Sequence, residues 1–196
     1  MESSTDEPSL ATIGHSNLTT VDFLSSLTKH GIDAIADVRT HPVSSYLPHF
    51  NKEPLKASLQ ESGFSYVSLG EELGGRPTGA SYYDSAGFVL YDQVAKSALF
   101  QTGLRRLLEG ASNFKIGVMC SEGVPDNCHR HLLIARVLDQ QGISVEHVLP
   151  DGSTKSASDL LAEHRPLPTL FGQEEQSWKS AQSALPSTPQ KTSSAS

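Results

Sequence analysis

Short apolar runs alternate along the chain with segments whose apolar residues recur at helical spacing. The apolar runs predict strands, which we place at residues 10–15, 32–39, 64–70, 114–120 and 144–150. The intervening segments predict helices at 19–31, 53–63, about 89–108, 128–142 and 156–164. Gly31 and Gly63 stand at the ends of the first two helices, where glycine commonly terminates a helix.

This alternation of strands and helices predicts an α/β fold. Strands joined through helices form right-handed crossovers, and these produce a parallel sheet that is covered on both faces. About five strands in this order suit an open, three-layer, doubly wound and mostly parallel sheet. A closed eight-fold barrel needs about 250 residues, whereas this chain has 196 residues.

Composition divides the chain into three parts. Residues 1–8 are polar and are expected to be flexible, and residues 9–164 are expected to form a single α/β domain. Residues 165–196 are rich in Ser, Pro and Gln. We expect them to form a largely disordered tail, because they offer little apolar surface to offset the entropy of ordering. Trp178 is among the few tail residues able to dock on the domain.

Charge and cysteine content narrow the class of protein. The net charge of −7 disfavours general duplex binding, which needs a basic face, and leaves room only for a local nucleic-acid contact. Two cysteines do not make a disulfide scaffold. The sequence shows no signal peptide and no apolar run of about 20 residues, so we expect a cytoplasmic protein with reduced thiols and no membrane partner.

Polar residues gather where the predicted strands end. In open α/β sheets, ligands bind beyond the carboxyl ends of the strands. The candidates at these ends are His15, Ser16, Asp37, Arg39, Ser44, Arg76, Cys120 and Glu122. Some of them also have a structural interpretation, since Asp37 and Arg39 suit an ion pair and Ser16 suits a helix cap. We expect the set to converge on one functional site at this edge of the sheet.

The stretch CSEGVPDNCHR at 120–130 holds both cysteines, between the end of a predicted strand and the start of a predicted helix. A helix start attracts anions and lowers the pKa of a nearby thiol. One interpretation is therefore a thiolate nucleophile with His129 or His15 as its base. We expect Cys128 to be the more exposed thiol, because Cys120 directly follows an apolar run and suits a buried structural position.

Two further interpretations of this stretch stay open. Glu122 and a histidine together activate water in hydrolases that use no covalent cysteine. Zinc is the metal suited to the two cysteines and one histidine, although their spacing is not that of a familiar zinc motif. The histidines available for such a site are His129, His131, His15 and His41. We therefore expect no cofactor, with zinc as the alternative.

Four motifs, in this order, resemble those of the family called domain of unknown function 488. They are TIGHSN, ADVRTHPVS, LGEELGG and MCSEGVPDNCHRHLLIARVL, and the resemblance runs from about residue 10 to residue 150. It implies a compact α/β domain with a shared site, and it implies no reaction. The positions that match the family pattern are His15, Ser16, Asp37, Arg39, Pro42, Gly74, Gly75, Cys120, Glu122, Cys128, His129 and Arg130.

A second resemblance is local. The segment IADVR is similar to a strand end of rhodanese-type sulfurtransferases, and the order strand, Cys, loop, helix is similar to these enzymes and to cysteine phosphatases. The phosphatase pattern places an Arg six residues after its Cys, where this chain has Asp126. An aspartate there repels phosphate, so phosphatase activity is disfavoured. Rhodanese-like sulfur transfer stays an alternative by analogy.

These patterns together predict an enzyme, a hydrolase or a transferase, that acts on a small anionic substrate such as a nucleotide or a nucleobase compound. The catalytic candidates are Cys128, His129, Glu122, His15 and Cys120. The substrate-binding candidates are Arg39, Arg76, Arg130, Asp37, Ser16 and Ser44. Arg130 has a structural alternative, an ion pair with Glu122 or Asp37. The functional alternatives are a non-catalytic nucleotide or nucleic-acid binding module and a zinc-dependent hydrolase.

Overall fold

A single sheet organises the computed structural model, which describes residues 10–163 and 178–184. Within this part of the chain the sheet has six strands, in the order β3-β2-β5-β1-β6-β7. The strands are β1 (Leu10–Gly14), β2 (Ala34–Asp37), β3 (Ser65–Ser68), β5 (Ile116–Cys120), β6 (Val145–Val148) and β7 (Thr154–Ser156). All pairings are parallel except that of β7, which lies antiparallel to β6 at the edge.

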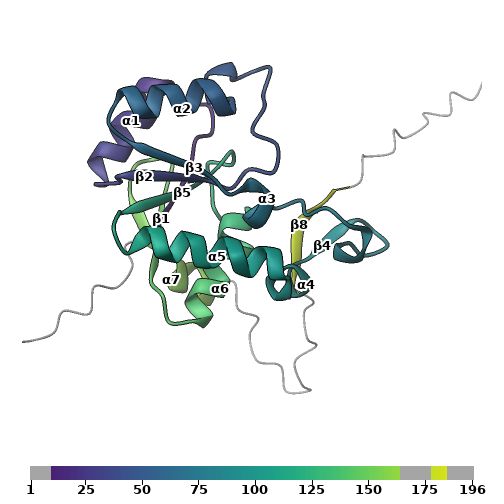
Figure 1. Ribbon diagram of the computed structural model, residues 1–196. Helices are drawn as coiled ribbons and strands as arrows, with labels where there is room; N and C mark the ends of the chain where they lie inside the picture. The colour runs from purple at the N-terminus through teal and green to yellow at the C-terminus, as the bar shows by residue number, and fades with distance from the viewer. Residues whose placement is uncertain (1–9, 164–177, 185–196) are drawn as a thin grey trace, which may run out of the picture.

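Helices cover both faces of this sheet (Figure 1). One face carries α1 (Thr20–Lys29) and α2 (Lys52–Glu61), and the other carries α5 (Ala98–Ala111), α6 (Arg136–Gln140) and α7 (Ala157–Glu163). The π-helix η3 (Arg130–Ala135) runs directly into α6. This arrangement confirms the expected open, mostly parallel, three-layer α/β fold.

The side-chain pattern of the strands explains the two layers. Successive strand residues point to opposite faces, and in β1 Leu10 belongs to the apolar cluster under α5 while Ile13 belongs to the cluster under α1 and α2. All five residues of β5 are buried, as expected for a strand covered on both faces. The start of α1 is fixed by Thr19, whose Oγ1 accepts the backbone N–H of Asp22 at 3.1 Å.

The segment expected to form one helix over 89–108 is divided into three elements. They are β4 (Phe88–Leu90), α4 (Tyr91–Lys96) and α5. The break falls at Ser97, which takes an extended backbone conformation and whose Oγ accepts the N–H of Phe100 at 3.2 Å. A serine is a good helix cap, so it begins a new helix at this point. The chain also forms α3 (Gly70–Leu73) and two 3-10 turns, η1 (Pro48–Phe50) and η2 (Ala80–Tyr82).

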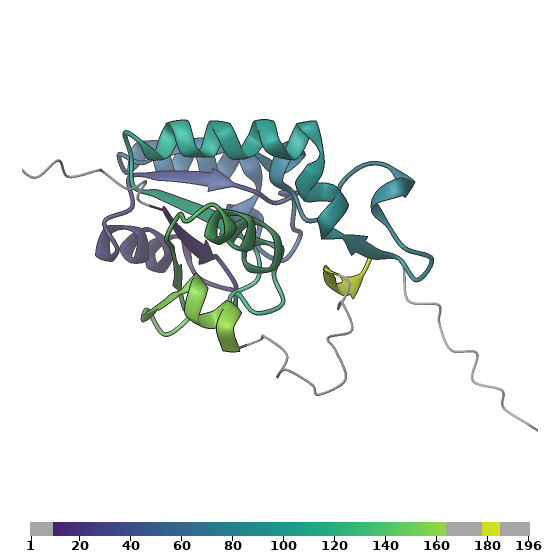
Figure 2. The same cartoon turned by 90° about the horizontal axis from the view of Figure 1, so that it is seen from below.

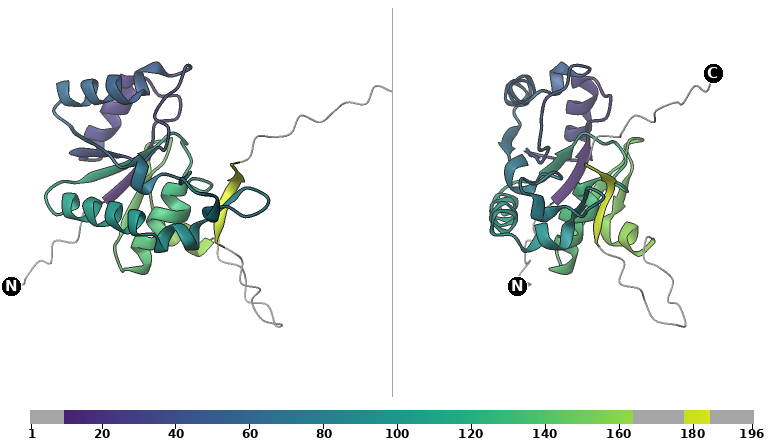
Figure 3. Two further views of the ribbon diagram at one scale, coloured as in Figure 1. Left: turned by 45° about the vertical axis from the view of Figure 1, so that its right-hand side comes forward. Right: turned by 90° about the vertical axis from the view of Figure 1, so that its right-hand side faces the viewer.

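Part of the expected disordered tail is an ordered strand. Residues of β8 (Lys179–Ser183) pair antiparallel with β4 and form a separate two-stranded sheet. Figures 2 and 3 show β8, in yellow, beside β4 on the side of the molecule away from α1. The expectations for residues 1–8, 165–177 and 185–196 lie outside the described residues. Among the described helices, none is long and apolar enough to cross a membrane.

The topology creates a crevice at the carboxyl end of β5. This strand lies between β1 and β2. The chain leaves β1 and β2 toward helices on one face, and it leaves β5 toward η3 and α6 on the other face. Adjacent parallel strands whose connections leave in opposite directions open a crevice beyond their carboxyl ends, which is the usual ligand site of such sheets.

Candidate functional site

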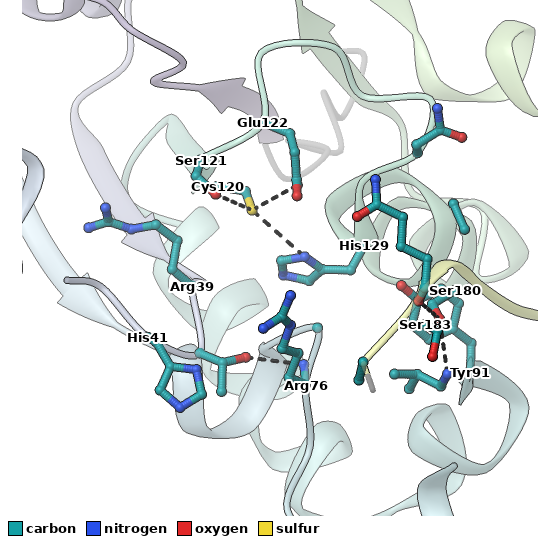
Figure 4. A pocket seen from close by; sticks show the side chains of 17 residues that line it. Arg39, His41, Arg76, Tyr91, Cys120, Ser121, Glu122, His129, Ser180 and Ser183 are labelled. Carbon is teal, nitrogen blue, oxygen red and sulfur yellow. Dashed lines mark hydrogen bonds between the residues drawn. The ribbon is translucent and has the colours of Figure 1, made fainter. Parts of the chain in front are cut away.

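A pocket of about 280 Å³ lies in this crevice. Its walls come from the loops that follow β2, α3 and β5, from β4 and α4, and from residues 180–184. Figure 4 shows Cys120, at the end of β5, and His129, at the start of the helix that follows, in the middle of the pocket. The site therefore stands where the expected polar residues were predicted to converge.

The orientation of His129 is fixed by a backbone carbonyl. Its Nε2 lies 3.1 Å from the carbonyl oxygen of Val38. A carbonyl only accepts hydrogen bonds, so Nε2 carries a hydrogen and donates it. The other ring nitrogen, Nδ1, then faces the two thiols, at 3.8 Å from Sγ of Cys120 and 3.9 Å from Sγ of Cys128. The buried imidazole thus presents its basic nitrogen to both sulfur atoms.

Two neighbours shift the pKa of Cys120. A hydrogen bond from Cys128 is the larger influence, and with the positive charge of His129 it outweighs burial and lowers the pKa of Cys120 far below that of an ordinary thiol. Burial opposes a charge on His129, yet the adjacent Cys120 thiolate and Glu122 raise the pKa of this imidazole. Both shifts favour a thiolate at Cys120 beside a protonated His129.

The pKa values of the remaining two groups, Cys128 and Glu122, are both raised. Burial, together with the hydrogen bond to Cys120, raises the pKa of Cys128 well above the ordinary thiol value. Burial and then the negative charge of Cys120 raise the pKa of Glu122, whose Oε2 lies 3.4 Å from the Cys120 sulfur. The site thus combines one thiolate with a carboxyl group able to hold a proton beside it.

The two cysteines differ from the expected order of exposure. Cys128 is 1% exposed and Cys120 is 4% exposed, and of the two only Cys120 lines the pocket. The start of the helix is buried, since His129, Arg130 and His131 are all covered as well. Cys128 therefore lies behind the pocket surface, and Cys120 is the thiol placed to meet a ligand.

Two glycines let backbone segments approach this centre. A Cβ atom on Gly75 would stand 2.7 Å from Cγ of His129, so only glycine leaves room for the imidazole. A Cβ atom on Gly14 would stand 1.8 Å from the carbonyl oxygen of Glu122, where the loop after β5 crosses the end of β1. The glycines of the TIGHSN and LGEELGG motifs thus have a structural role in holding the site together.

Asp37 and Arg39 form the expected ion pair at the end of β2. Arg39 donates from Nε to Oδ1 of Asp37 at 2.9 Å and from Nη2 to Oδ2 at 2.7 Å. Tyr66 donates a further hydrogen bond to Oδ2 at 2.9 Å. Arg39 lines the pocket while Asp37 lies behind it. The pair is a rigid, charge-balanced wall.

His15 orients Arg39 and does not line the pocket. Its Nδ1 donates to the carbonyl oxygen of Ser16 at 2.9 Å, which leaves Nε2 to accept from Nη1 of Arg39 at 3.2 Å. The ring stacks on Phe50 with a centroid separation of 4.1 Å. Burial is the main cause that lowers the pKa of His15 to about 4. The neutral imidazole is held between these partners and orients Arg39. The role of His15 as a proton carrier stays a prediction.

Arg130 is likewise placed behind the pocket. Its side chain is fully buried, and it donates from Nη1 to the carbonyl oxygen of Glu122 and from Nη2 to that of Gly123 at 2.7 Å. The expected alternatives were an anion or the carboxylate of Glu122 or Asp37, and the observed partners are backbone carbonyls instead. Arg130 therefore holds the loop that carries Glu122 over the site.

Neither serine candidate lines the pocket. Ser16 takes a left-handed backbone conformation with φ of 46° in the turn after β1. The Oγ of Ser44 accepts the backbone N–H groups of Tyr46 at 3.2 Å and Leu47 at 3.1 Å, so it shapes a loop. The structure thus gives both residues a local turn role.

Arg76 does lie at the pocket. Its backbone N–H donates to Oγ1 of Thr40 at 3.1 Å, and Figure 4 shows its guanidinium directed toward the pocket below His129. Its side chain is exposed and makes no ion pair within the described residues. Arg76 is thus a cation available to a ligand.

Sequence reasoning missed two parts of the pocket wall. Tyr91 was hidden inside a predicted helix, and residues 180–184 were hidden inside the predicted tail. The one sequence signal for the second part was Trp178, the only tryptophan in the chain, in an otherwise polar segment.

Four side chains of the site also fit a zinc ion. The ligand atoms of Cys120, Glu122, Cys128 and His129 all lie within 4.8 Å of one another. Thiolate, imidazole and carboxylate are the groups that bind zinc. The hydrogen bond from Nε2 of His129 to a carbonyl is the outer contact that orients metal-binding histidines. Glu122 adds a fourth possible ligand to the two cysteines and one histidine that the sequence suggested.

Fold and site together define a doubly wound α/β protein with a cysteine–histidine centre at the end of its central strand. Residues 19–137 match the family described as Domain of unknown function DUF488, and the chain belongs to this family. The matched residues include Arg39, Arg76 and the whole 120–130 stretch, and they exclude His15 and β8. No curated protein and no solved structure matches the chain.

Proposed function

We propose that this protein is an enzyme that attacks an electrophilic centre of a small anionic substrate with the thiolate of Cys120. The observation that carries the proposal is the geometry of His129. A carbonyl fixes its tautomer, and Nδ1 faces Cys120 at 3.8 Å on the floor of a pocket. A cysteine paired with an oriented histidine is the arrangement that activates sulfur nucleophiles.

The other groups of the site supply the remaining steps. The Cys120 sulfur forms a bond to the electrophilic centre while the bond from that centre to the leaving group breaks. The leaving group takes the proton held by Glu122. Water then attacks the same centre and returns a proton to Glu122, and Cys120 leaves as a thiolate. His129 stays positively charged beside the sulfur throughout. With an acceptor other than water, the same steps give a transferase.

We assign to Arg76 the binding of the anionic part of the substrate. This side chain faces the pocket and has no carboxylate partner among the described residues. Arg39 contributes a fixed wall, because Asp37 already balances its charge. A phosphate or carboxylate group at Arg76 places the rest of a small molecule against Cys120. Nucleotides are the anionic substrates that we test first.

A zinc-dependent hydrolase is the second candidate, favoured by the mutual distances of the same four side chains. In that case Cys120 is a metal ligand and not a nucleophile. The two functions make opposite predictions for the thiols, because a sulfur atom bound to zinc is protected from alkylation while a free thiolate reacts quickly.

The deciding experiment measures metal content and then the rate at which iodoacetamide alkylates each cysteine from about pH 5 to pH 9. We expect a metal-free protein in which Cys120 reacts well below an ordinary thiol pKa of about 8.5, while Cys128 stays inert. Cys128→Ser keeps the fast reaction and Cys120→Ser removes it. Stoichiometric zinc with both thiols protected until chelation would overturn the proposal in favour of the zinc enzyme.

The anion role has its own test. Arg76→Gln is compared with Arg105→Gln, which removes an exposed arginine from α5 far along the chain. We expect nucleoside monophosphates to raise the melting temperature of the wild type and of Arg105→Gln, and to leave Arg76→Gln unchanged. Binding of nucleotides together with two inert, metal-free thiols would instead support a non-catalytic binding module.

A further inference from the structure

The segment from Trp178 to Ala184, here called the strap, is fastened to the domain by its tryptophan. The indole Nε1 donates to the carbonyl oxygen of Leu132 at 2.6 Å. The ring lies under the guanidinium of Arg136, at 4.6 Å, and packs edge-on against Tyr91 with a centroid separation of 6.4 Å. The backbone N–H of Tyr91 donates to the carbonyl oxygen of Trp178 at 2.9 Å. One side chain therefore ties the strap to α4, η3 and α6.

The rest of the strap is held along β4. The Oγ of Ser180 accepts the N–H of Val89 at 2.9 Å, and the N–H of Ala184 donates to the carbonyl oxygen of Gly87 at 2.8 Å. Lys179 forms an ion pair with Asp84 at 2.7 Å. These contacts fix both ends of the strap, so its middle is an ordered wall of the pocket.

The strap faces Arg39 and His41 across the pocket (Figure 4). In Figure 4, Arg39 and His41 lie on one side, Ser180, Ser183 and Tyr91 lie on the other, and Cys120 and His129 stand between them. The pocket-lining residues of the strap are Ser180, Ala181, Gln182, Ser183 and Ala184. They carry hydroxyl, amide and backbone groups and no charge. Asp37 balances the charge of Arg39, so the cationic part of the pocket is at Arg76. The hydroxyl groups of Ser180 and Ser183 donate to carbonyl oxygens of the protein, so the amide of Gln182 is the main hydrogen-bonding group of the neutral part at the strap.

We propose that the strap selects the substrate: it binds a neutral, hydrogen-bonding part of the molecule and limits how far that part extends beyond Cys120. This inference rests on the proposed function, because it takes Cys120 as the reacting atom. The substrate class is then a compact molecule with an anion at one end, a neutral polar group at the other and an electrophilic centre between. The strap lies outside the residues matched to the family, so the part of the pocket wall that it forms lies outside the matched region.

The test compares two thiol reagents of different length in the full chain. Iodoacetamide is short, and its N-phenyl derivative extends into the space that the strap borders. For each thiol we take the rate with iodoacetamide divided by the rate with the longer reagent, and free glutathione serves as the unhindered reference thiol. We expect this ratio to be about tenfold larger for Cys120 in the wild type than for glutathione, which is the size of discrimination that a pocket wall provides. Trp178→Ala frees the strap and brings the ratio to that of glutathione, whereas Trp178→Phe keeps most of the discrimination.

Phe114→Ala is the matched control, since it removes a half-exposed aromatic side chain outside the strap and the pocket. The same ratio of rates in the wild type and in Trp178→Ala would overturn the proposal. If Cys120 itself does not react, the proposed function fails, and the strap is then tested separately. A reporter thiol, Ser121→Cys in a Cys120→Ser background, lines the same pocket and measures the same size ratio.

A second measurement tests the neutral half. Nucleoside monophosphates and ribose 5-phosphate share the anion and the sugar, and only the nucleotides add a nucleobase, which is a neutral hydrogen-bonding group at the end away from the phosphate. We expect the nucleotides to protect the pocket thiol from alkylation at lower concentration than ribose 5-phosphate does. Gln182→Leu reduces that difference at nearly constant side-chain volume. Equal protection by both kinds of ligand, or no protection by either, would contradict a neutral binding site at the strap.

Discussion

The carbonyl oxygen of Val38 accepts a hydrogen bond from Nε2 of His129 at 3.1 Å, and this contact decides what the imidazole offers to the pocket. Val38 comes directly after β2 and His129 begins the helix after β5. This hydrogen bond therefore joins the segments that follow two neighbouring strands of the sheet. The donor is a side chain and the acceptor is backbone. The tautomer of the histidine is therefore set by the fold itself rather than by another side chain.

Substitution of Gly75, which packs against the imidazole of His129, tests this arrangement. In Gly75→Ala the new Cβ stands 2.7 Å from Cγ and 2.8 Å from Nδ1 of His129, so the imidazole must move away from Cys120. We expect alkylation of Cys120 at about pH 6 to slow by about a hundredfold, as its pKa returns toward an ordinary value of about 8.5.

The control for this substitution is Gly110→Ala on α5. Its added Cβ meets only Cδ1 of Ile116, at 3.0 Å, at the flexible end of a side chain. We expect its thiol reactivity to equal that of the wild type. Equal rates in Gly75→Ala as well would show that the position of His129 does not activate Cys120.

Arg130 provides a prediction about stability. Its guanidinium is fully buried and donates to the carbonyl oxygens of Glu122 and Gly123. Arg130→Met keeps much of the volume and leaves both carbonyls without this donor. We expect the free energy of unfolding in urea to fall by about 2–4 kcal/mol, since each buried polar group left unpaired costs about 1–3 kcal/mol. A loss below about 0.5 kcal/mol would mean that water replaces the guanidinium without penalty.

The ion pair behind the pocket gives a related prediction. Asp37→Asn removes the charge that balances Arg39, which is only 7% exposed. Loss of one partner of a buried pair destabilises a protein by about 3–5 kcal/mol. Tyr66→Phe is the control, because it removes one hydrogen bond to Asp37 and leaves the pair intact. We expect its loss to be about 1 kcal/mol, measured by the same denaturant titration. Equal losses in the two variants would contradict the importance of the charge balance.

Acid sensitivity follows from two buried histidines. Burial, followed by the charges of His131 and Arg130, lowers the pKa of His147 to about 3, and burial lowers that of His15 to about 4. Both have an ordinary pKa of 6.5 in the unfolded chain. Below that value the unfolded chain binds protons that the folded protein does not, so stability falls as the pH drops from 6.5 toward 4.

The measurement is the free energy of unfolding at a series of pH values. Each histidine contributes a slope of up to about 1.4 kcal/mol per pH unit in this range. Nδ1 of His147 forms a hydrogen bond with Oγ1 of Thr12 at 2.7 Å and its Nε2 forms one with Nδ1 of His131 at 2.9 Å, and His147→Gln removes its titration. We expect that variant to lose about half of the slope. Gln60→Ala, at an exposed position without a titratable group, should retain the full slope.

Strand and helix periodicity predicted the sheet and its two layers, because strands such as β5 are continuous apolar runs, which are typical of strands covered on both faces. The break at Ser97 was not predictable from periodicity, since the apolar residues on either side keep a helical spacing across it. Strand β8 was missed for a different reason. Its own residues are polar, and its position depends on contacts that Trp178 makes with residues distant in the sequence.

The candidate site was predicted as a location and less well as a set of roles. The strand-end rule placed Arg39, Arg76, Cys120 and Glu122 together because it depends only on topology. It does not say which side of a loop faces the ligand. Arginine is usually an exposed residue, so a fully buried Arg130 under its own loop contradicts the ordinary preference of its residue type.

The π-helical turn of η3 makes the site sensitive to the length of the chain at one place. The backbone N–H of Arg136 donates to the carbonyl oxygen of His131, five residues earlier. This turn therefore contains one residue more than an α-helical turn. Deletion of a single residue here would restore α-helical spacing and rotate everything before it by about 100° relative to α6. With the packing of α6 unchanged, His129 would then turn away from Val38, and Arg130 would turn away from the loop that carries Glu122 and Gly123. The register of one helical turn thus couples the hydrophobic core to the chemistry.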